Sequence, residues 1–327
     1  MTSMLVSRRS ALAASLACLL LATAARAQDW PTARHLTAII PFGAGSSTDI
    51  IARVVLEEVS RQIGQSIVVE NRPGASGTIG ANAVAKAAPD GYTILVHSSS
   101  HTVVPSTFTK LPYSVEQDFT PVAALANIPN VVVANPKKGY KTLQDLVDDA
   151  RRNPGRLNYA SAGVGSATHL AVERLKQSAG IEAQHVPFKG SSEALTEVIA
   201  ERIDFYAAPV NTAVQFIKEG QLTALAVSSA RRAAALPDVP TAIEAGLRDS
   251  DYEFWIGAFL PGQTSKEIVD RLHAGIFKAL ATPGLEKRFH DLGAEPMKMS
   301  PEQFKAQVRR EVEGNAVLVK AAGIKPN

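Results

Sequence analysis

Short apolar runs alternate with segments of helical periodicity along most of the chain. The runs are rich in β-branched residues and predict buried strands at residues 36–40, 66–70, 92–96, 157–160, 183–187, 203–208 and 222–229. Apolar residues at helical spacing predict helices at residues 50–63, 78–88, 143–152, 170–179 and 191–201. This alternation predicts an α/β fold with a largely parallel sheet.

The first strand-to-helix junction, residues 41–49, has the chemistry of an anion site. Its glycines allow a tight turn, and its hydroxyls can cap the following helix. The start of a helix presents free N–H groups and the positive end of the dipole to an anion. The candidate contacts are Phe42, Gly45, Ser46, Ser47 and Thr48, whereas Asp49 would repel an anion and is interpreted as a structural acid.

A second loop repeats this pattern. Residues 163–170 align with residues 43–50, with both glycines, the next serine and the threonine in the same places. Each loop follows a predicted strand and opens a helix. Two matching loops indicate two α/β lobes that present equivalent helix starts to a ligand between them. The candidates in the second loop are Ser161, Gly163, Ser166 and Thr168.

Other polar residues lie at the ends of predicted strands, where open α/β sheets bind ligands. Ser98 and Ser99 follow one strand, and Lys189 is a cation in a loop that opens a helix. Asp204 and Asn211 flank a further strand and are candidates for closing the hydrogen-bond network.

Two apolar segments, residues 119–133 and 254–260, are placed to carry the chain between the lobes. They predict one lobe from residues 28–128 plus 256–327 and another from residues 129–255. Helices expected at 267–280, 285–292 and 301–322 would return to the first lobe. Thr212 and Thr241 are expected to cap helices. Two crossings form the hinge of a protein that closes on a ligand.

The N-terminus predicts a secretory signal peptide. Arg8 and Arg9 precede an apolar run at 11–25, and Ala27 ends a small-residue cleavage pattern. The arginine pair loosely resembles a twin-arginine signal, although general secretion is favoured. The only cysteine, Cys18, lies in this segment, so the mature chain has no disulfide and no thiolate nucleophile.

The charge balance and the placement of histidines argue against a nucleic-acid-binding protein and a metal site. Three of the 34 Lys and Arg residues lie in the signal, which leaves 31 against 31 acids, so nucleic-acid binding has no support. His97 and His101, like His169 and His185, are expected to make local hydrogen bonds, because no metal-ligand set or cofactor motif accompanies them. A serine hydrolase has weak support, because Gly165-Ser166-Ala167 lacks the second glycine of a nucleophile elbow.

Six short motifs follow one another along the mature sequence. They are Pro41-Phe42 with Gly45 and Asp49; Glu70-Asn71-Arg72-Pro73-Gly74-Ala75; Ala88-Pro89-Asp90-Gly91-Tyr92-Thr93; Tyr159-Ala160-Ser161 with Gly163, Gly165-Ser166 and His169-Leu170; Val186-Pro187-Phe188-Lys189-Gly190; and Leu236-Pro237-Asp238-Val239-Pro240-Thr241. Together they resemble the Bug family, the periplasmic solute-binding proteins of tripartite tricarboxylate transporters. The resemblance implies a two-lobed type II periplasmic-binding-protein (Venus flytrap) fold. It also implies a carboxylate held by the two matching loops, largely through backbone groups and ordered waters.

The sequence departs from the family pattern at three places. Ser46 replaces the second glycine of the first loop, Ser76 replaces the glycine after Pro73-Gly74-Ala75, and Asn315 stands where a tryptophan is common in the last helix. Ser46 puts a hydroxyl close to the expected ligand, which makes it the first candidate for specificity.

We therefore expect a monomeric periplasmic receptor without enzymatic activity, metal or cofactor. It would capture a small carboxylate and deliver it to the membrane components of a tripartite tricarboxylate-type transporter. A dicarboxylate, aliphatic or aromatic, is favoured because each lobe offers one anion site. Two alternatives stay open. One is a secreted hydrolase that uses Ser166 or a hydroxyl at 98–100, and the other is a ligand sensor with the same fold.

Overall fold

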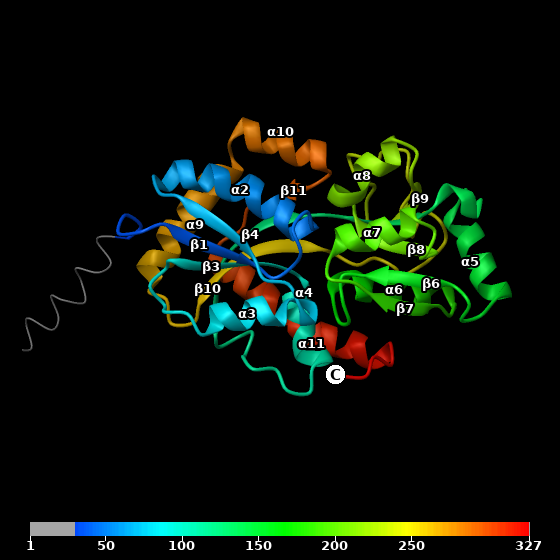
Figure 1. Cartoon of the computed structure of the whole chain (residues 1–327), viewed down its shortest axis with the longest axis horizontal. Coiled ribbons are helices and arrows are strands. Elements are labelled where there is room, and N and C mark those ends of the chain that lie inside the picture. Colours follow the sequence, from blue (N-terminus) through cyan, green and yellow to red (C-terminus); the bar gives the residue numbers. More distant parts are fainter. Residues whose placement is uncertain (1–29, 327) are drawn as a thin grey trace, which may run out of the picture.

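The computed structural model describes residues 30–326, and the proposed signal peptide lies outside them. Two β-sheets, each flanked by helices, form two lobes that lie side by side (Figure 1). We call the lobe around the six-stranded sheet the first lobe and that around the five-stranded sheet the second lobe. Within residues 30–326, no helix is both long and apolar enough to span a bilayer.

The six-stranded sheet has the order β11-β4-β10-β3-β1-β2. Its strands are β1 (Leu36–Ile40), β2 (Ile67–Asn71), β3 (Thr93–Ser98), β4 (Phe119–Asn127), β10 (Trp255–Pro261) and β11 (Glu295–Pro296). The helices of this lobe are α2 (Ser47–Ile63), α3 (Thr78–Ala85), α4 (Ser100–Thr107), α9 (Lys266–Leu280), α10 (Pro283–Leu292) and α11 (Pro301–Ala321).

The five-stranded sheet has the order β7-β6-β8-β5-β9. Its strands are β5 (Asn130–Ala134), β6 (Asn158–Ser161), β7 (Gln184–Pro187), β8 (Phe205–Pro209) and β9 (Thr223–Val227). Its helices are α5 (Leu143–Arg152), α6 (Ala167–Ala179), α7 (Ser191–Ile199) and α8 (Val210–Lys218).

Both sheets are mixed, so the expectation of a largely parallel sheet is wrong. β1 pairs in parallel with β2 and β3, and β6 with β7 and β8. However, β10 is antiparallel to β3 and β4, and β5 is antiparallel to β8 and β9. The strands that break the parallel pattern include β5 and β10, which lie next to the crossing segments. A strand that returns from the other lobe enters its sheet from the opposite end, which fixes its direction.

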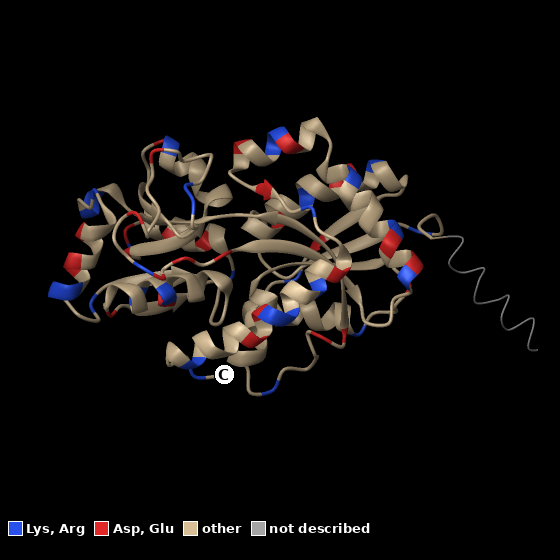
Figure 2. Cartoon of the chain, turned by 180° about the vertical axis from the view of Figure 1, so that it is seen from behind, with Lys and Arg blue, Asp and Glu red and all other residues tan. Residues whose placement is uncertain are grey.

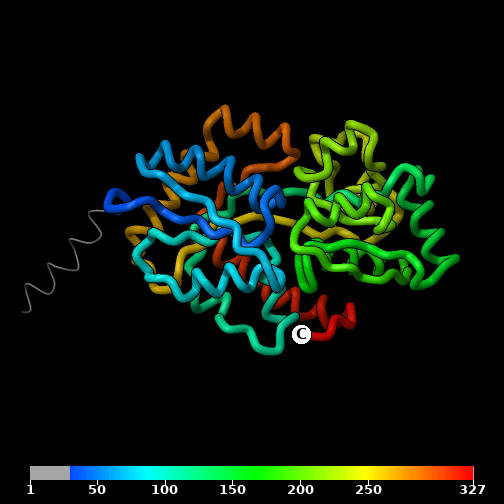
Figure 3. Tube along the Cα trace, in the orientation of Figure 1, coloured from blue at the N-terminus to red at the C-terminus, as the bar shows by residue number. Residues whose placement is uncertain are grey.

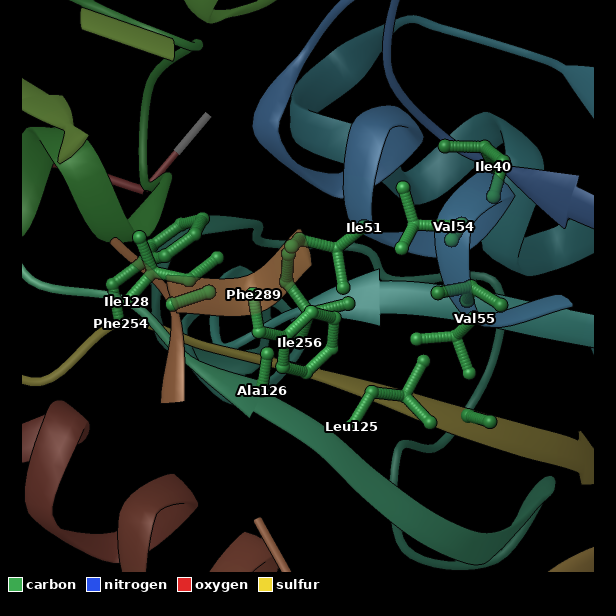
Figure 4. Packing of buried hydrophobic residues seen from close by; sticks show 14 of the residues in the cluster. Ile40, Ile51, Val54, Val55, Leu125, Ala126, Ile128, Phe254, Ile256 and Phe289 are labelled. Carbon is green, nitrogen blue, oxygen red and sulfur yellow. The ribbon is translucent and has the colours of Figure 1, made fainter. Parts of the chain in front are cut away.

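The two crossing segments run next to each other (Figure 3). One joins β4 to β5 and the other leads into β10, and Ile128 N donates to Phe254 O at 2.7 Å. Figure 4 shows these two side chains lying together, with Ile51 of α2 pointing towards Ile256 of β10. One buried apolar cluster therefore continues from the first lobe through the hinge to residues such as Val210 of the second lobe.

Three local expectations are corrected. Residues 100–107 form helix α4, where the sequence pattern predicts no helix. Helix α8 begins at Val210, so Thr212 lies inside it and donates to Pro209 O rather than capping it. Thr241 accepts from Glu244 N at 3.0 Å as a cap would, but a turn and not a helix follows.

Candidate ligand site between the lobes

Four helix N-termini meet at the boundary between the lobes. Helices α2 and α4 come from the first lobe, and α6 and α7 from the second. Their first turns and the preceding loops surround a cavity of about 10 Å³, enough for about one water molecule. It is lined by Phe42, Ser46, Ser47, Thr48, Ser98, Ser100, Ala162, Thr168, Ser191 and Phe254. The polar groups in this lining are all hydroxyls.

The two matching loops cap their helices in the same way. Ser46 Oγ accepts from Asp49 N at 3.3 Å, and Ser166 Oγ accepts from His169 N at 3.2 Å. Because the first N–H groups of a helix have no intrahelical acceptor, such a cap leaves others free to face a ligand. The repeat seen in the sequence is therefore a repeat in geometry.

Asp49 supports the first loop from behind. Its carboxylate accepts from Gly45 N, Arg53 Nε and Asn71 Nδ2, each at 2.9 Å. Burial alone would raise the pKa of Asp49, but the hydrogen bonds from Arg53, Asn71 and Gly45 outweigh it and hold the pKa below its usual value. The ionised carboxylate fixes the turn at Gly45, whose φ is 72°.

A second, larger cavity of about 390 Å³ adjoins the first. The two share Phe42 and Ala162. Its wall combines rings with backbone from both lobes and is lined by Pro41, Phe42, Gly74, Ala75, Ser76, Gly77, Phe108, Ala162, Gly163, Val164, Pro187, Phe188, Lys189 and Glu193. It offers a mostly apolar space with one cation and one acid at the exposed edge.

A stacked histidine pair, buried His169 and half-buried His185, holds the second-lobe loop. His169 Nδ1 accepts from Gly165 N at 3.0 Å, and its ring stacks on His185 with centroids 3.8 Å apart. His185 Nε2 lies 2.5 Å from Ser161 Oγ. Burial lowers the pKa of His169 to about 4, with a further contribution from Lys176. The neutral imidazole can therefore accept the backbone N–H near pH 7.

The first-lobe histidines behave differently. His97 Nδ1 lies 3.0 Å from Ser98 O, and burial lowers the pKa of His97 to about 3. His101 packs edge-on against Phe119 and Phe259, and its ring nitrogens have no hydrogen-bond partner in the described structure. The expectation of local hydrogen bonding is therefore wrong for His101. Among residues 30–326, no group of three or more His, Cys, Asp or Glu side chains is placed to hold a metal ion.

Most candidate residues from the sequence lie at the two cavities. Phe42 lines both; Ser46, Ser47, Thr48, Ser98 and Thr168 line the small one, and Gly163 and Lys189 the large one. All the others except Asp204 lie beside these cavities. Gly45 O accepts from Ser192 Oγ at 2.6 Å, Ser161 Oγ donates to Gly163 O at 3.0 Å, Asn211 bonds Ser47, and the Ser99 backbone N–H donates to Trp255 O.

Asp204 does not belong to this site. It precedes β8, whereas Asn211 follows the carboxyl end of that strand, so the two lie at opposite edges of the sheet. Asp204 accepts from Asn158 N at 2.7 Å and also bonds Lys138 Nζ. We replace its assignment to the ligand site with a structural role at the amino end of β8.

Ser76 and Ser191 at the boundary were not among the predicted contacts, and Ser100 was considered only together with the other hydroxyls at 98–100. Ser100 Oγ accepts from Ala167 N of the second lobe at 2.8 Å, Ser191 lines the small cavity, and Ser76 Oγ donates to Val164 O. Ser100 and Ser191 follow strand ends, as the chosen candidates do, and that position was their sequence signal.

Ser166 is not placed as the nucleophile of a hydrolase. Ser166 Oγ accepts from His169 N and lies 3.1 Å from Thr168 Oγ1. The Nδ1 atom of His169 already accepts a hydrogen bond from Gly165 N. A general base must reach the hydroxyl proton of its nucleophile, and His169 is engaged elsewhere.

Two lobes, two crossing segments and helix N-termini facing shared cavities define a two-lobed solute-binding protein. A family model described as tripartite tricarboxylate transporter family receptor matches residues 51–324. The chain belongs to this TctC/Bug family, a family of solute-binding receptors and not of enzymes.

Solved structures agree with this assignment. Rpa4515 from R. palustris with adipate is 32% identical, with a TM-score of 0.88 over 91% of this chain and 100% of that one. MatC from Rhodopseudomonas palustris with bound malate is 33% identical, with a TM-score of 0.84 over 88% and 99%. The periplasmic binding protein BugD is 32% identical, with a TM-score of 0.86 over 90% and 99%. These relatives show the periplasmic-binding-protein fold.

Proposed function

We propose that this protein is a periplasmic receptor that binds a small dicarboxylate between its lobes and delivers it to the membrane components of a tripartite tricarboxylate transporter. The observation that carries the proposal is the meeting of α2, α4, α6 and α7 at one buried, hydroxyl-lined site. Helix N-termini stabilise anions, and here both lobes contribute them.

One carboxylate would occupy the hydroxyl-lined end. It would accept hydrogen bonds from the first N–H groups of α2 and from hydroxyls such as Ser47 and Thr168, directly or through water. No acidic side chain appears in the lining of the small cavity within the described residues, so no carboxylate side chain would contact it directly. The small volume means that the lobes must adjust around the group.

The rest of the ligand would extend into the larger cavity. Phe42 and Phe188 would cover its carbon chain, and Lys189 would attract a second carboxylate at the exposed edge. Relatives solved with adipate and malate support a dicarboxylate. Because the anion contacts come from both lobes, ligand affinity is higher for the closed form, and this difference drives closure.

Export rests on the predicted signal segment and on periplasmic relatives. Within the described residues, Figure 2 shows basic and acidic positions interspersed over the helices of both lobes. A mixed surface suits a protein that diffuses to a membrane partner and does not favour a polyanion.

A thermal-shift screen with mono-, di- and tricarboxylates tests the ligand class. A ligand at a hundred times its Kd adds about 2.7 kcal/mol, which corresponds to a rise in Tm of roughly 5–10 °C for a chain of this order. The compounds to compare are succinate, malate, adipate, an aromatic dicarboxylate, citrate and acetate. They should raise Tm by different amounts, and a dicarboxylate should give the largest rise. If none of them shifts Tm, the proposal fails.

Delivery needs a separate measurement. Reconstituted transporter membrane proteins should take up the dicarboxylate only when the loaded receptor is added. If the receptor instead co-purifies with a sensor kinase and leaves uptake unchanged, the ligand-sensor alternative replaces transport.

A further inference from the structure

The loop before α3 has an unusual backbone. Residues 74–77 all have positive φ, at 131°, 45°, 55° and 93° in order. Two of them, Ala75 and Ser76, are not glycine, and a non-glycine residue in the left-handed region is disfavoured. Such backbone persists only where its surroundings hold it, and it is often found at ligand clamps. We call residues 74–77 the latch loop.

The latch loop is fixed to the first lobe. Gly77 N donates to Gly74 O at 3.0 Å, and Gly77 lies against the ring of His97 so closely that a Cβ there would be 2.6 Å from Nε2. Next to the loop, Gly80 of α3 packs against Pro41, where a Cβ would be 2.8 Å from the proline Cβ. The loop is therefore held in its conformation by contacts within its own lobe.

From this fixed base, Ser76 reaches the second lobe. Its hydroxyl donates to the carbonyl oxygen of Val164, and the residue is only 8% exposed. Gly163 also packs against Ser76, because a Cβ at that position would lie 2.8 Å from Ser76 Oγ. Ser76, Gly163 and Val164 all line the larger cavity, so the contact forms part of its wall.

We propose that Ser76 is a positioning residue that latches the lobes together over the ligand and thereby sets how long the ligand stays bound. This inference rests on the proposed function of the site. The bond joins two lobes, so it exists only when they are together, and its free energy belongs to the closed form alone. A neutral hydrogen bond of ordinary net strength changes an equilibrium by about 3- to 10-fold.

Two substitutions distinguish the effect of the Ser76 hydrogen bond from the effect of the disfavoured backbone conformation. Ser76→Ala removes the hydroxyl and keeps a residue for which φ of 55° is unfavourable. Ser76→Gly removes the hydroxyl and also relieves the backbone. Ser229→Ala is the matched control, since Ser229 Oγ also donates to a backbone carbonyl, that of Arg231, but within one lobe.

Stopped-flow binding of the best dicarboxylate from the thermal screen gives the rates. Both Ser76 variants should release the ligand about 3- to 10-fold faster with association little changed, and Ser229→Ala should match wild type. Ser76→Gly should also have a higher Tm than Ser76→Ala. Wild-type release in both variants would overturn the proposal. Faster release in Ser76→Ala alone would overturn it too, because the effect would then come from the backbone.

A ligand-free measurement separates this inference from the proposed function. Spin labels on Lys86→Cys in the first lobe and Thr196→Cys on α7 report the distance between the lobes. Both Ser76 variants should shift the distances towards longer values without any carboxylate. Unchanged distances would overturn the latch even if the protein binds dicarboxylates. A shift in a protein that binds none would support the latch and refute the function.

Discussion

Ser47 and Asn211 bond each other twice across the boundary between the lobes. Ser47 Oγ donates to Asn211 Oδ1 at 2.7 Å, and Asn211 Nδ2 donates to Ser47 O at 3.3 Å. The chain separates the two residues by 164 positions, and both are buried. The start of α2 is thus joined directly to the first turn of α8.

Asn211→Ala should weaken dicarboxylate binding about tenfold. It leaves a buried hydroxyl and a buried carbonyl without partners, at a cost of about 1–3 kcal/mol. The Tm of the unliganded protein should fall little, because each lobe keeps its own core. Calorimetric titration gives the affinity. The Ser47→Ala/Asn211→Ala double variant should bind more tightly than additivity predicts, and strict additivity would show that the pair is not coupled.

Ser46 should prove to have two separable roles. It caps α2 and lines the small cavity. Ser46→Ala should cost about 1 kcal/mol of stability, whereas Ser46→Gly should cost only a few tenths. If the hydroxyl also contacts the ligand, both variants should lose affinity by the same factor despite their different Tm values. If Ser46→Ala instead loses more affinity than Ser46→Gly, in line with its lower Tm, then Ser46 serves only as the helix cap.

The His169 network should make the protein acid-sensitive. The pKa of His169 is about 4 in the folded chain against about 6.5 when unfolded, so the unfolded state binds more protons between these values. Stability is therefore lost as pH falls from about 6.5 towards 4, by at most roughly 3 kcal/mol for this residue.

His169→Asn should flatten this dependence. An asparagine Oδ1 can stand near Nδ1 and accept from Gly165 N, but it does not titrate. Urea unfolding at several pH values should show a shallower slope below pH 6.5 than wild type. His169→Gln places its amide near Nε2 instead and should lose stability at every pH. Identical slopes for wild type and His169→Asn would contradict the assigned role.

Glu311 gives the opposite dependence on pH. It lies on α11, where both of its oxygens accept from Trp255 Nε1 of β10 at 2.8 Å, and Thr102 Oγ1 donates to it at 3.2 Å. Burial raises the pKa of Glu311 despite these hydrogen bonds. A raised folded pKa means that stability is lost as pH rises through that value. Glu311→Gln should therefore gain in Tm relative to wild type as the pH rises above about 4.5, by thermal unfolding across pH 4–8.

Much of the fold could be read from local pattern. Strand 36–40 and helix 143–152 were predicted with the bounds that the structure has. The repeated loops were recognised because glycine and hydroxyl positions coincide, and Ser46 and Ser166 do cap equivalent helices. Helix α4 was missed because Pro105 and its β-branched neighbours have low helix propensity, and packing stabilises the helix despite them.

The site was harder to predict, for physical reasons. Asp204 and Asn211 both flank β8, and only the direction of the strand shows which end faces the cavities. The bonds of Ser100 to Ala167 and of Ser76 to Val164 join segments 67 and 88 positions apart. No local periodicity encodes such contacts, because they follow from how the two lobes meet.

The place of β10 in its sheet has a consequence for the order of folding. β10 lies between β3 and β4, yet it follows the whole second lobe in the sequence. During synthesis, β3 and β4 must wait for Trp255–Pro261 before they can join one sheet. The strands of the second sheet lie within residues 130–227, so that sheet can be completed earlier. Pairing between distant segments is slow. The lobe that is synthesised first is therefore the last to close its core.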